Sequence, residues 1–391
     1  MKNKAVVLGA NYYIALSVMR NLGKYGIEVV ALEYSKKGAY ALKSKYCSGV
    51  EIVPHYKNET EEFIKALIEY AKKQEKKPFL VPCADPYVEV IDKYSDKLKE
   101  YYLLPDMKEG QYTEIIDKDT LSVLAKKYNV LIPETLQMND EKLFEKTVDI
   151  GYPCLVKPIN SHEFVRIFRK KMFKVYSEKE LKDAIDTAKN ENMEVIIQQI
   201  IPGFDDHMYT YDAYMNNDSE VTHWLTCHKL RQYPINYGAS AYTEQKYVQE
   251  LHEIGAPFFK KIGYKGFAEI EFKKHKDTGK YYLIEINVRY SNLNELLTQV
   301  GINMPYITYM DLIGEPLKEK HIDYDSGLVF RYTLEDILAI KGYLSTKQLK
   351  LLPVIKSLFR KKVHAIRSFD DRAPVIAYGK ILFKKMIKKI F

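Results

Sequence analysis

Short apolar runs and amphipathic stretches alternate along the first hundred residues. The runs cover residues 6–8, 27–32, 50–53 and 79–82, and the stretches cover residues 14–22, 60–73 and 88–94. The runs have the length of buried strands, and the stretches repeat apolar side chains with the helical period. This alternation predicts a parallel sheet with helices on both faces. Ligands bind beyond the carboxyl ends of such strands, where Asn11 and Asp85 stand.

A different pattern begins after residue 117. It predicts helices over residues 118–128, 140–150 and 177–189, short strands over residues 154–158, 173–175 and 195–199, and longer alternating strands over residues 208–215, 221–229, 266–274 and 280–287. The predicted fold class is therefore α/β at the N-terminus and α+β beyond it. A chain of 391 residues is long enough for two or three such domains.

Acidic side chains gather on the hairpin predicted at residues 266–287. Strand alternation places Glu269 and Glu271 on one face, and Glu285 and Asn287 on one face of the neighbouring strand. Their oxygens suit Mg²⁺, which takes its remaining ligands from water and phosphates. The alternative is a half-exposed hairpin with solvated acids. The apolar residues on both sides of Glu285 favour the metal, because a buried acid is costly without a compensating cation.

Polar side chains also stand at the ends of other predicted strands. Lys157 ends a buried strand, where an ammonium group suits a phosphate. Gln198 and Gln199 run into a Pro-Gly turn, whose backbone could pair with an adenine edge. Asp205 and Asp206 follow and could accept hydrogen bonds from ribose hydroxyls. Each segment, taken alone, also fits an ordinary strand end or connection.

Two cations share one strand near residue 230. Lys229 and Arg231 are two residues apart, so alternation predicts them on one face. A pair of fixed cations suits a γ-phosphate or an acyl phosphate. A solvated basic strand end is the equally simple alternative.

The order of these residues resembles that of the ATP-grasp superfamily over about residues 1–315. The residues that carry the resemblance are Lys118, Lys157, Gln199–Gly203, Arg231, Glu271 and Glu285-Ile286-Asn287-Val288-Arg289. Within the superfamily, residues 81–85 and 231–234, together with Gly238, look most like the carboxylate–amine ligases, and especially the D-aspartate ligases. The resemblance implies an ATP-grasp fold. Its expected parts are an N-terminal Rossmann-like domain (1–115), a central subdomain with a lid (116–202), a C-terminal subdomain (203–330) and a basic extension (331–391).

The resemblance implies ATP and Mg²⁺ as cofactors, with two ions expected and Mn²⁺ as a substitute. The residues implied for ATP are Lys118, Lys157, Ser161, Gln198, Gln199, Ile201, Asp205 and Asp206. Those implied for the metal are Glu271, Glu285 and Asn287. The lid departs from the family pattern, because residues 159–171 contain no glycine and offer Ser161, His162 and basic side chains instead.

The same resemblance implies roles in catalysis and in substrate binding. Arg231, Arg289 and Lys229 would stabilise the acyl phosphate and its transition state. Asn11, Asp85 and Gly238 would bind substrate. No nucleophile motif of the Ser-His-Asp or Cys-His kind is present, and acyl transfer through a phosphate needs none.

The implied function is ATP-dependent ligation of a carboxylate to an amine through an acyl phosphate, which releases ADP and phosphate. An amino acid is the expected carboxylate substrate, and a cell-wall or surface-polysaccharide precursor is the expected acceptor. One alternative is a ligase of free amino acids or dipeptides. Another is a non-catalytic nucleotide-binding protein at a membrane surface. A homodimer is expected by analogy alone.

The net charge of +8 is concentrated at the C-terminus. Residues 341–391 hold 14 Lys and Arg against Asp370 and Asp371, so this segment carries +12 and the remainder −4. An acidic body argues against nucleic-acid binding. The segment alternates apolar and basic residues, as helices that lie on anionic membranes do, although a helix packed on the body fits equally well.

Cysteine usage and hydropathy indicate the compartment. The four cysteines are scattered and form no C-x-x-C pair, which makes a disulfide scaffold and a structural zinc site improbable. No apolar run reaches the length of about 18 residues that a membrane-spanning helix needs. The N-terminal apolar run is too short for a signal peptide. We therefore expect a cytoplasmic protein, with peripheral contact at the inner face of the membrane through residues 341–391.

Overall fold

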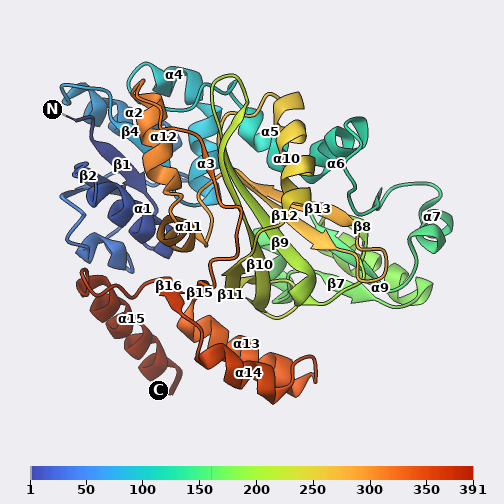
Figure 1. The fold of residues 1–391 in the computed structure, drawn as a ribbon. Helices are drawn as coiled ribbons and strands as arrows, with labels where there is room; N and C mark the ends of the chain where they lie inside the picture. Colours follow the sequence, from blue (N-terminus) through green and yellow to red (C-terminus); the bar gives the residue numbers. More distant parts are fainter. Residues whose placement is uncertain (1, 160, 391) are drawn as a thin grey trace.

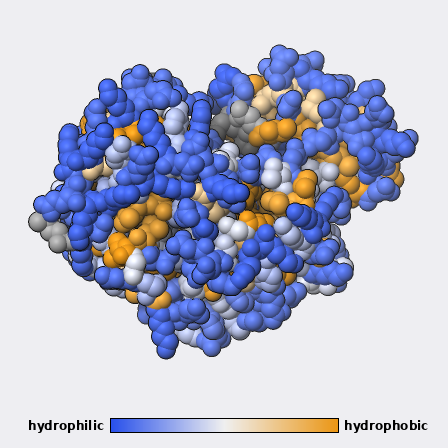
Figure 2. Space-filling view, turned by 90° about the horizontal axis from the view of Figure 1, so that it is seen from above, coloured by the Kyte–Doolittle hydropathy of each residue, from blue (hydrophilic) through white to orange (hydrophobic). Residues whose placement is uncertain are grey.

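Three sheets organise the chain (Figure 1). The computed structural model describes residues 2–159 and 161–390, without the side chains of Ser161, His162 and residues 388–390. On the face seen in Figure 2, hydrophilic side chains cover most of the surface, and apolar side chains gather in a few separate areas. Within the described residues, no helix is both long and apolar enough to cross a membrane.

A parallel four-stranded sheet forms the N-terminal domain, in the order β3-β2-β1-β4. Its strands are β1 (Ala5–Leu8), β2 (Val29–Glu33), β3 (Gly49–Ile52) and β4 (Phe79–Pro82). Its helices are α1 (Tyr13–Gly23), η1 (Tyr40–Lys43), α2 (Thr60–Lys72), α3 (Asp85–Lys93) and α4 (Ser95–Lys99). Apolar side chains fill both faces, with α1 on one side and α2 and α3 on the other. The predicted α/β class is confirmed.

The carboxyl ends of β1 and β4 lie side by side, because these two strands are paired. Asn11 follows β1, and Asp85 begins α3 directly after β4. Gly9 takes the left-handed conformation, with φ +91°, at the end of β1. In the next residue, the Ala10 N–H donates to the buried Glu33 carboxylate. The structure therefore places both predicted substrate residues at one edge of the sheet.

A small antiparallel sheet forms the middle of the chain, in the order β5-β8-β6-β7. Its strands are β5 (Thr135–Gln137), β6 (Cys154–Pro158), β7 (Phe173–Val175) and β8 (Val195–Gln199). Helices α5 (Gln111–Ile116) and α6 (Lys118–Lys127) lead into it, and α7 (Leu143–Ile150), α8 (Ser161–Phe168) and α9 (Glu178–Asn190) accompany it. A separate apolar core joins α7, α8 and α9 to this sheet.

The third sheet is built on long strands, in the order β13-β12-β9-β10-β11-β15-β16, with β14 beside β10. Its strands are β9 (Met208–Met215), β10 (Val221–Tyr233), β11 (Ala239–Gln245), β12 (Gly266–Lys274), β13 (Tyr281–Asn287), β14 (Lys320–His321), β15 (Val329–Arg331) and β16 (Lys362–His364). Its helices are η2 (Asp205–His207), α10 (Gln249–Lys261), α11 (Asn294–Val300) and α12 (Met304–Leu312). Strand β10 runs four residues past the predicted end at residue 229.

The C-terminal segment folds back onto the body (Figure 1). It contains α13 (Thr333–Ser345), α14 (Leu351–Leu358) and α15 (Ala373–Ile390). Strand β16 pairs with β15, so the segment also extends the large sheet. Two buried ion pairs fasten it: Arg231 Nε lies 2.6 Å from Asp336, and Arg20 Nε lies 2.9 Å from Asp371. Residues 331–391 are therefore an integral part of the fold.

Candidate active site

The acidic hairpin brings its polar side chains to one face. In β12 and β13, Glu271 is paired with Glu285, and Glu269 is paired with Asn287. Paired residues of antiparallel strands lie on the same face. The Asn287 Nδ2 donates to Glu269 Oε1 over 3.0 Å. The structure therefore assembles the three predicted metal ligands and adds Glu269, which the sequence places on this face but which we did not assign to the site.

Negative charge exceeds positive charge on this face. Lys229 Nζ lies 2.5 Å from Glu271 Oε1, and Asp212 is paired with Glu269 in the sheet. Burial, together with neighbouring acids, raises the pKa of Glu269 and Glu271 above their ordinary range, and burial alone raises that of Asp212. Burial disfavours the charge of Lys229, but Glu271 and Glu269 outweigh it, so its pKa is raised. Arg289 also acts on Glu269 and Glu285, but with the exposed Glu285 included, four carboxyl groups still face only these two cations.

This donor set fits Mg²⁺. Within residues 2–159 and 161–390, no three His, Cys, Asp or Glu side chains form a ready-made metal site. Glu271, Glu285 and the amide oxygen of Asn287 are hard oxygen donors, and Mg²⁺ completes its octahedron with water and substrate phosphates. The raised acid pKa values indicate that a further cation would stabilise the face.

Two lysines approach the hairpin from the other side of the cleft. Lys157, in β6, donates to Gln198 Oε1 over 3.0 Å, and Gln198 in turn donates to Thr135. Lys118 begins α6 and donates to the Pro158 carbonyl over 3.0 Å. Burial and the charge of Lys118 lower the pKa of Lys157 to about 8. Burial also lowers the pKa of Lys118. Within the part of the chain that the structure describes, neither cation is bonded to a carboxylate, which is the environment that a phosphate would complete.

A cavity of about 150 Å³ lies between Lys157 and the hairpin, whereas Lys118 lines a separate cavity. Of the predicted residues, its walls include Lys157, Gln198, Gln199, Ile201, Gly238, Glu271 and Glu285. The Gln199 side-chain oxygen accepts a hydrogen bond from the Glu134 N–H, and the buried Ile201 forms an apolar part of the cavity wall. Six of the predicted nucleotide and metal residues therefore border one cavity together with Gly238, predicted for the substrate.

The turn between β10 and β11 closes one end of this cavity. Gly238 lies here with no room for a side chain, because an added Cβ would meet the Tyr233 carbonyl carbon at 2.0 Å. Lys171, which follows α8, donates a hydrogen bond to the Tyr237 carbonyl over 3.1 Å and so links the segment after α8 to the turn. Ser161 is the first residue of α8, but its side chain lies outside the described residues. Its role with ATP stays a prediction.

The ribose role predicted for Asp205 and Asp206 stays a prediction. Neither residue lines the cavity. Asp205 is buried in η2 and accepts hydrogen bonds from the Asn236 N–H, at 2.7 Å, and from the Tyr343 hydroxyl. Asp206 is exposed and bonds His207 at 2.9 Å. Donors from the backbone and from α13 thus already occupy Asp205, while both carboxylates act on Lys273, which lines the cavity.

The prediction that Arg231 shares a face with Lys229 is wrong. The β10–β11 register shifts between these residues, with Lys229 opposite Thr243 and Arg231 opposite Tyr242. A bulge of this kind turns the following side chain to the other face of the strand. Arg231 is therefore buried against Asp336, with its guanidinium 3.8 Å from the Tyr242 ring centre. It is a structural anchor here and does not reach the cavity.

Arg289 meets the N-terminal domain at the far end of the hairpin. Its Nε lies 2.5 Å from Asp85 Oδ1, and its Nη2 lies 3.3 Å from Oδ2, a two-pronged pair. The structure thus joins a predicted catalytic residue to a predicted substrate residue. Asn11 lies elsewhere, in the wall of a larger cleft beside Tyr12 and Tyr13. Tyr12 interacts electrostatically with both Asp85 and Arg289, so this cleft approaches the same point.

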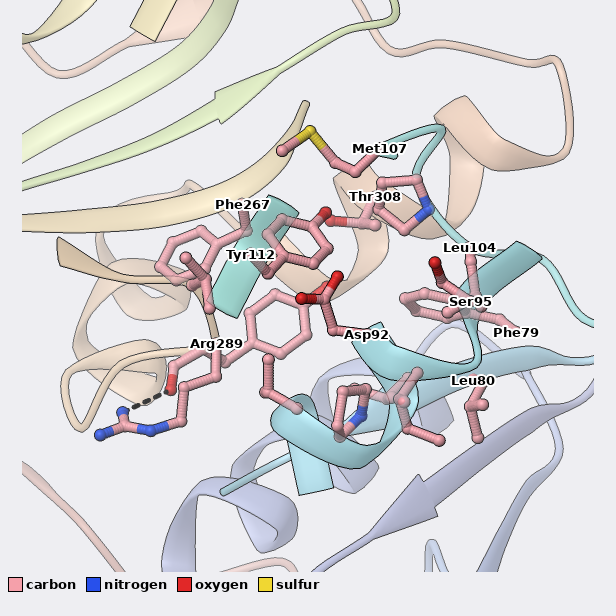
Figure 3. A pocket seen from close by; sticks show the side chains of 17 residues that line it. Phe79, Leu80, Asp92, Ser95, Leu104, Met107, Tyr112, Phe267, Arg289 and Thr308 are labelled. Atoms are coloured by element: carbon pink, nitrogen blue, oxygen red, sulfur yellow. Dashed lines mark hydrogen bonds between the residues drawn. The ribbon is translucent and has the colours of Figure 1, made fainter. Parts of the chain in front are cut away.

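An apolar cavity of about 70 Å³ lies behind Arg289 (Figure 3). Phe79, Phe267 and Tyr112 line it, and the guanidinium head points away from it toward the Tyr290 carbonyl. Asp92 Oδ1 and Ser95 Oγ are buried here without a hydrogen-bond partner. This space is small and enclosed by apolar groups, so it is not the nucleotide site. It has room for a few water molecules.

Sequence reasoning missed Lys273, which lines the nucleotide cavity in the same strand as Glu271. Burial lowers its pKa. Strand alternation from Glu269 and Glu271 leads directly to this residue, so the signal was present. Gln232 and Asn236 also line the cavity, but their positions depend on the bulge and turn that follow Lys229. Periodicity alone does not reveal them.

Residues 118–309 match the family model described as D-ala D-ala ligase C-terminus. The match covers just under half of the chain and, together with the D-aspartate ligase relative described next, supports the ATP-grasp ligase that the sequence implies. The chain is 27% identical to the D-aspartate ligase of Enterococcus faecium over 286 residues, which is 69% of this chain and 68% of that relative. It is an ATP-dependent carboxylate–amine ligase, as the resemblance implied.

Solved structures have the same fold at low identity. The biotin carboxylase domain of Hydrogenobacter thermophilus 2-oxoglutarate carboxylase, in complex with MgADP, ADP and bicarbonate, has a TM-score of 0.65 and 16% identity; the match covers 84% of this chain and 74% of that one. The L-amino acid ligase of Bacillus licheniformis has a TM-score of 0.57 and 14% identity, with 81% and 76% covered. These likenesses confirm the ATP-grasp fold, whose members use ATP with Mg²⁺.

Proposed function

We propose that the protein joins the carboxylate of an amino acid to an amine acceptor that belongs to a cell-wall or surface-polysaccharide precursor. The observation that carries the proposal is the cavity shared by Lys157, Glu271 and Glu285. Similarity to a D-aspartate ligase supports the amino-acid substrate. A ligase of free amino acids is the second candidate, supported by the fold likeness to an L-amino acid ligase.

The reaction has two steps. The substrate carboxylate attacks the γ-phosphorus of ATP, ADP leaves, and an acyl phosphate forms. The acceptor nitrogen then attacks the acyl carbon, the bond from that carbon to the phosphate oxygen breaks, phosphate leaves and the nitrogen releases its surplus proton. Phosphoryl transfer depends on positioning and electrostatic stabilisation, so no covalent enzyme nucleophile is needed.

Each step has residues suited to it. Lys157, fixed by Gln198, and Lys118, fixed by the Pro158 carbonyl, would neutralise phosphate oxygens. Arg289, fixed by Asp85, would stabilise the negative charge that develops on the acyl group. Glu271, Glu285 and Asn287 would hold two Mg²⁺ ions, which Mn²⁺ would replace. Mg²⁺ would supply additional positive charge next to the transferred phosphoryl group.

The test is the Glu285→Ala variant. We expect carboxylate-dependent ADP formation to fall by at least about 100-fold, since a fixed electrostatic contact to the reacting group is lost. The control is Glu253→Ala, an exposed acid on α10. A screen of amino acids, each with and without amine acceptors, would identify the substrates. Wild-type turnover in Glu285→Ala would refute the metal-site assignment.

We also propose that the acceptor is reached at the inner face of the cytoplasmic membrane. Apolar side chains are exposed on the basic C-terminal helices, among them Leu351 and Leu352 at 61% and Phe359 at 85% of their surface. Cations in the same segment would attract anionic lipid. Deleting the segment would also remove β16 and Asp371, so point variants are the better test. We expect Leu351→Ser/Phe359→Ser to pellet less with anionic vesicles than wild type; equal pelleting would contradict this proposal.

A further inference from the structure

A cleft of about 870 Å³ lies between the N-terminal domain and helix α15. One wall is the segment after β1, with Asn11 and Tyr13. The other is formed by the start of α13, with Glu335, and by α15, with Tyr378. Half of this cleft therefore comes from the C-terminal segment, which lies beyond residues 118–309 that match the ligase family.

Tyrosines give the cleft a fixed shape. The rings of Tyr13 and Tyr332 are 4.9 Å apart, and those of Tyr40 and Tyr378 are 5.1 Å apart. The hydroxyl groups of Tyr332 and Tyr378 are 2.6 Å apart and hydrogen-bonded. These contacts link α15 to the N-terminal domain and to the residue just before α13. The walls are packed against one another, so the cleft is part of the fold.

The side chains that line the cleft carry more positive than negative charge. Lys37, Lys384 and Lys385 line it, and all three are exposed and have no ion-pair partner in the described part of the chain. Glu335 is its single lining acid among those residues, and its carboxylate has no hydrogen-bond partner there. Burial raises the pKa of Glu335 to about 7. Three cations and one half-buried carboxyl group suit a ligand that carries phosphate together with an amine or hydroxyl groups.

The cleft reaches toward the reacting groups. Tyr12 and Tyr13 line the cleft just after β1, which is paired with β4; Asp85, at the start of the helix after β4, bonds Arg289. A ligand held by the lysines could therefore extend past Tyr13 toward Arg289. Among the described residues, the nucleotide cavity and this cleft share no lining residue. Two substrates could thus approach the hairpin separately.

We propose that this cleft binds the amine acceptor, and that the acceptor carries phosphate. Lys37, Lys384 and Lys385 hold its phosphate groups, and its amine passes Tyr13 to reach the acyl phosphate beside Arg289. The role of this cleft as an acceptor site rests on the proposed ligase function. Binding of the acceptor, however, can be measured without catalytic turnover. It gives the C-terminal helix a role in choosing the acceptor.

The test uses the full chain with its nucleotide site filled by a non-hydrolysable ATP analogue and Mg²⁺. UDP-glucosamine, which combines a diphosphate with a primary amine, is titrated calorimetrically. We expect Lys384→Ala/Lys385→Ala to weaken binding at least about tenfold, since charge-assisted contacts are lost, and Lys37→Ala to weaken it also. Lys380→Ala on the same helix is the matched control, because Lys380 is exposed and lies outside the cleft. Binding should weaken as salt increases.

A second arm separates free from lipid-borne acceptors. Phosphatidylcholine vesicles with and without phosphatidylethanolamine present an amine phosphate on a lipid. Dependence on Lys384 and Lys385 in the titration assigns a free acceptor, and the same dependence with vesicles alone assigns a lipid headgroup. Wild-type binding in the double variant in both arms, or no binding at all, overturns the proposal. Binding without any ligase turnover would instead refute the proposed function and leave the cleft assignment standing.

Discussion

The buried charges beside the acidic hairpin differ from those beneath the C-terminal helices in their balance. At the hairpin, Lys118 and Lys157 have no carboxylate partner among the described residues, and Lys229 pairs with Glu271 and leaves Glu269 without an ion pair there. Beneath the helices, the buried acids Asp336 and Asp371 are each paired with an arginine, Arg231 and Arg20. A buried charge that is paired with an opposite charge in the protein needs no ligand to compensate it. Unmatched charges indicate that a ligand with charges of its own completes the site.

Removing Lys157 tests whether the unpaired cations at the hairpin serve the reaction and not the stability of the fold. We expect Lys157→Met to lower kcat for ADP formation by about 10²–10³-fold, because a fixed cation near the transferred phosphoryl group is lost. The melting temperature should stay the same or rise, since burial already disfavours this charge. Lys126→Met, which removes an exposed ion pair with Glu134, is the control. A large loss of stability in Lys157→Met would make this lysine a structural residue.

Asp371 provides the opposite case. Asp371→Ala leaves Arg20 buried and unpaired, which typically costs about 3–5 kcal/mol of unfolding free energy. The carboxylate of Asp371 also accepts from Ser44 Oγ at 2.7 Å, so a second contact is lost. Chemical denaturation measures the effect. The neighbouring Asp370→Ala is the matched control, because Asp370 is exposed and its hydrogen bonds to Tyr46 and Ser368 lie at the surface. Equal denaturation midpoints would show that the buried pair does not hold the segment.

The sequence predicts the unmatched site better than the matched one. Glu271, Glu285 and Asn287 were identifiable because alternation with period two fixes which side chains share a face of a regular hairpin. Arg231 was misplaced because one bulge reverses that alternation, and no local pattern indicates a bulge. The partners Arg20 and Asp371 were not predicted, since ion pairs between residues far apart in sequence depend on tertiary packing. Hydrophobic and polar periodicity therefore predicts which side chains share a face of a strand, but it does not predict contacts between residues far apart in the sequence.

A pH measurement sharpens the comparison further. Burial and Lys118 hold the pKa of Lys157 at about 8, below the ordinary lysine value, so this group is about half protonated at pH 8 without nucleotide. A bound triphosphate favours the ammonium form and raises that pKa. Nucleotide binding at pH 8 should therefore take up as much as about half a proton from this group. Calorimetry in buffers of different ionisation enthalpy measures the uptake.

The Lys157→Arg variant is the control for this uptake, since arginine stays charged at this pH. We expect its proton uptake to fall by the Lys157 contribution. The lowered pKa of Lys157 also makes the stability of the protein depend on pH. Between about pH 8 and the ordinary lysine pKa, the unfolded chain binds more protons at this site than the folded chain does. The free energy of unfolding should consequently rise through this range without nucleotide. An unchanged uptake in Lys157→Arg would place the titrating group elsewhere.

The smallest expected effect tests whether a missing partner alone marks a functional site. Ser95 Oγ and Asp92 Oδ1 have no hydrogen-bond partner in the apolar cavity behind Arg289. Asp92 nevertheless accepts two hydrogen bonds from Thr113 through its other oxygen, both at 2.8 Å. We expect Ser95→Ala to change the free energy of unfolding by no more than about 0.5 kcal/mol, since no protein contact is lost. Thr113→Val removes one contact to Asp92 and should cost about 1–3 kcal/mol. Neither variant should change kcat, because the unpaired atoms here face water-sized space and no cluster of like charges. A fall in kcat for Ser95→Ala would mean that single unpaired polar atoms, as well as unbalanced clusters, serve the reaction.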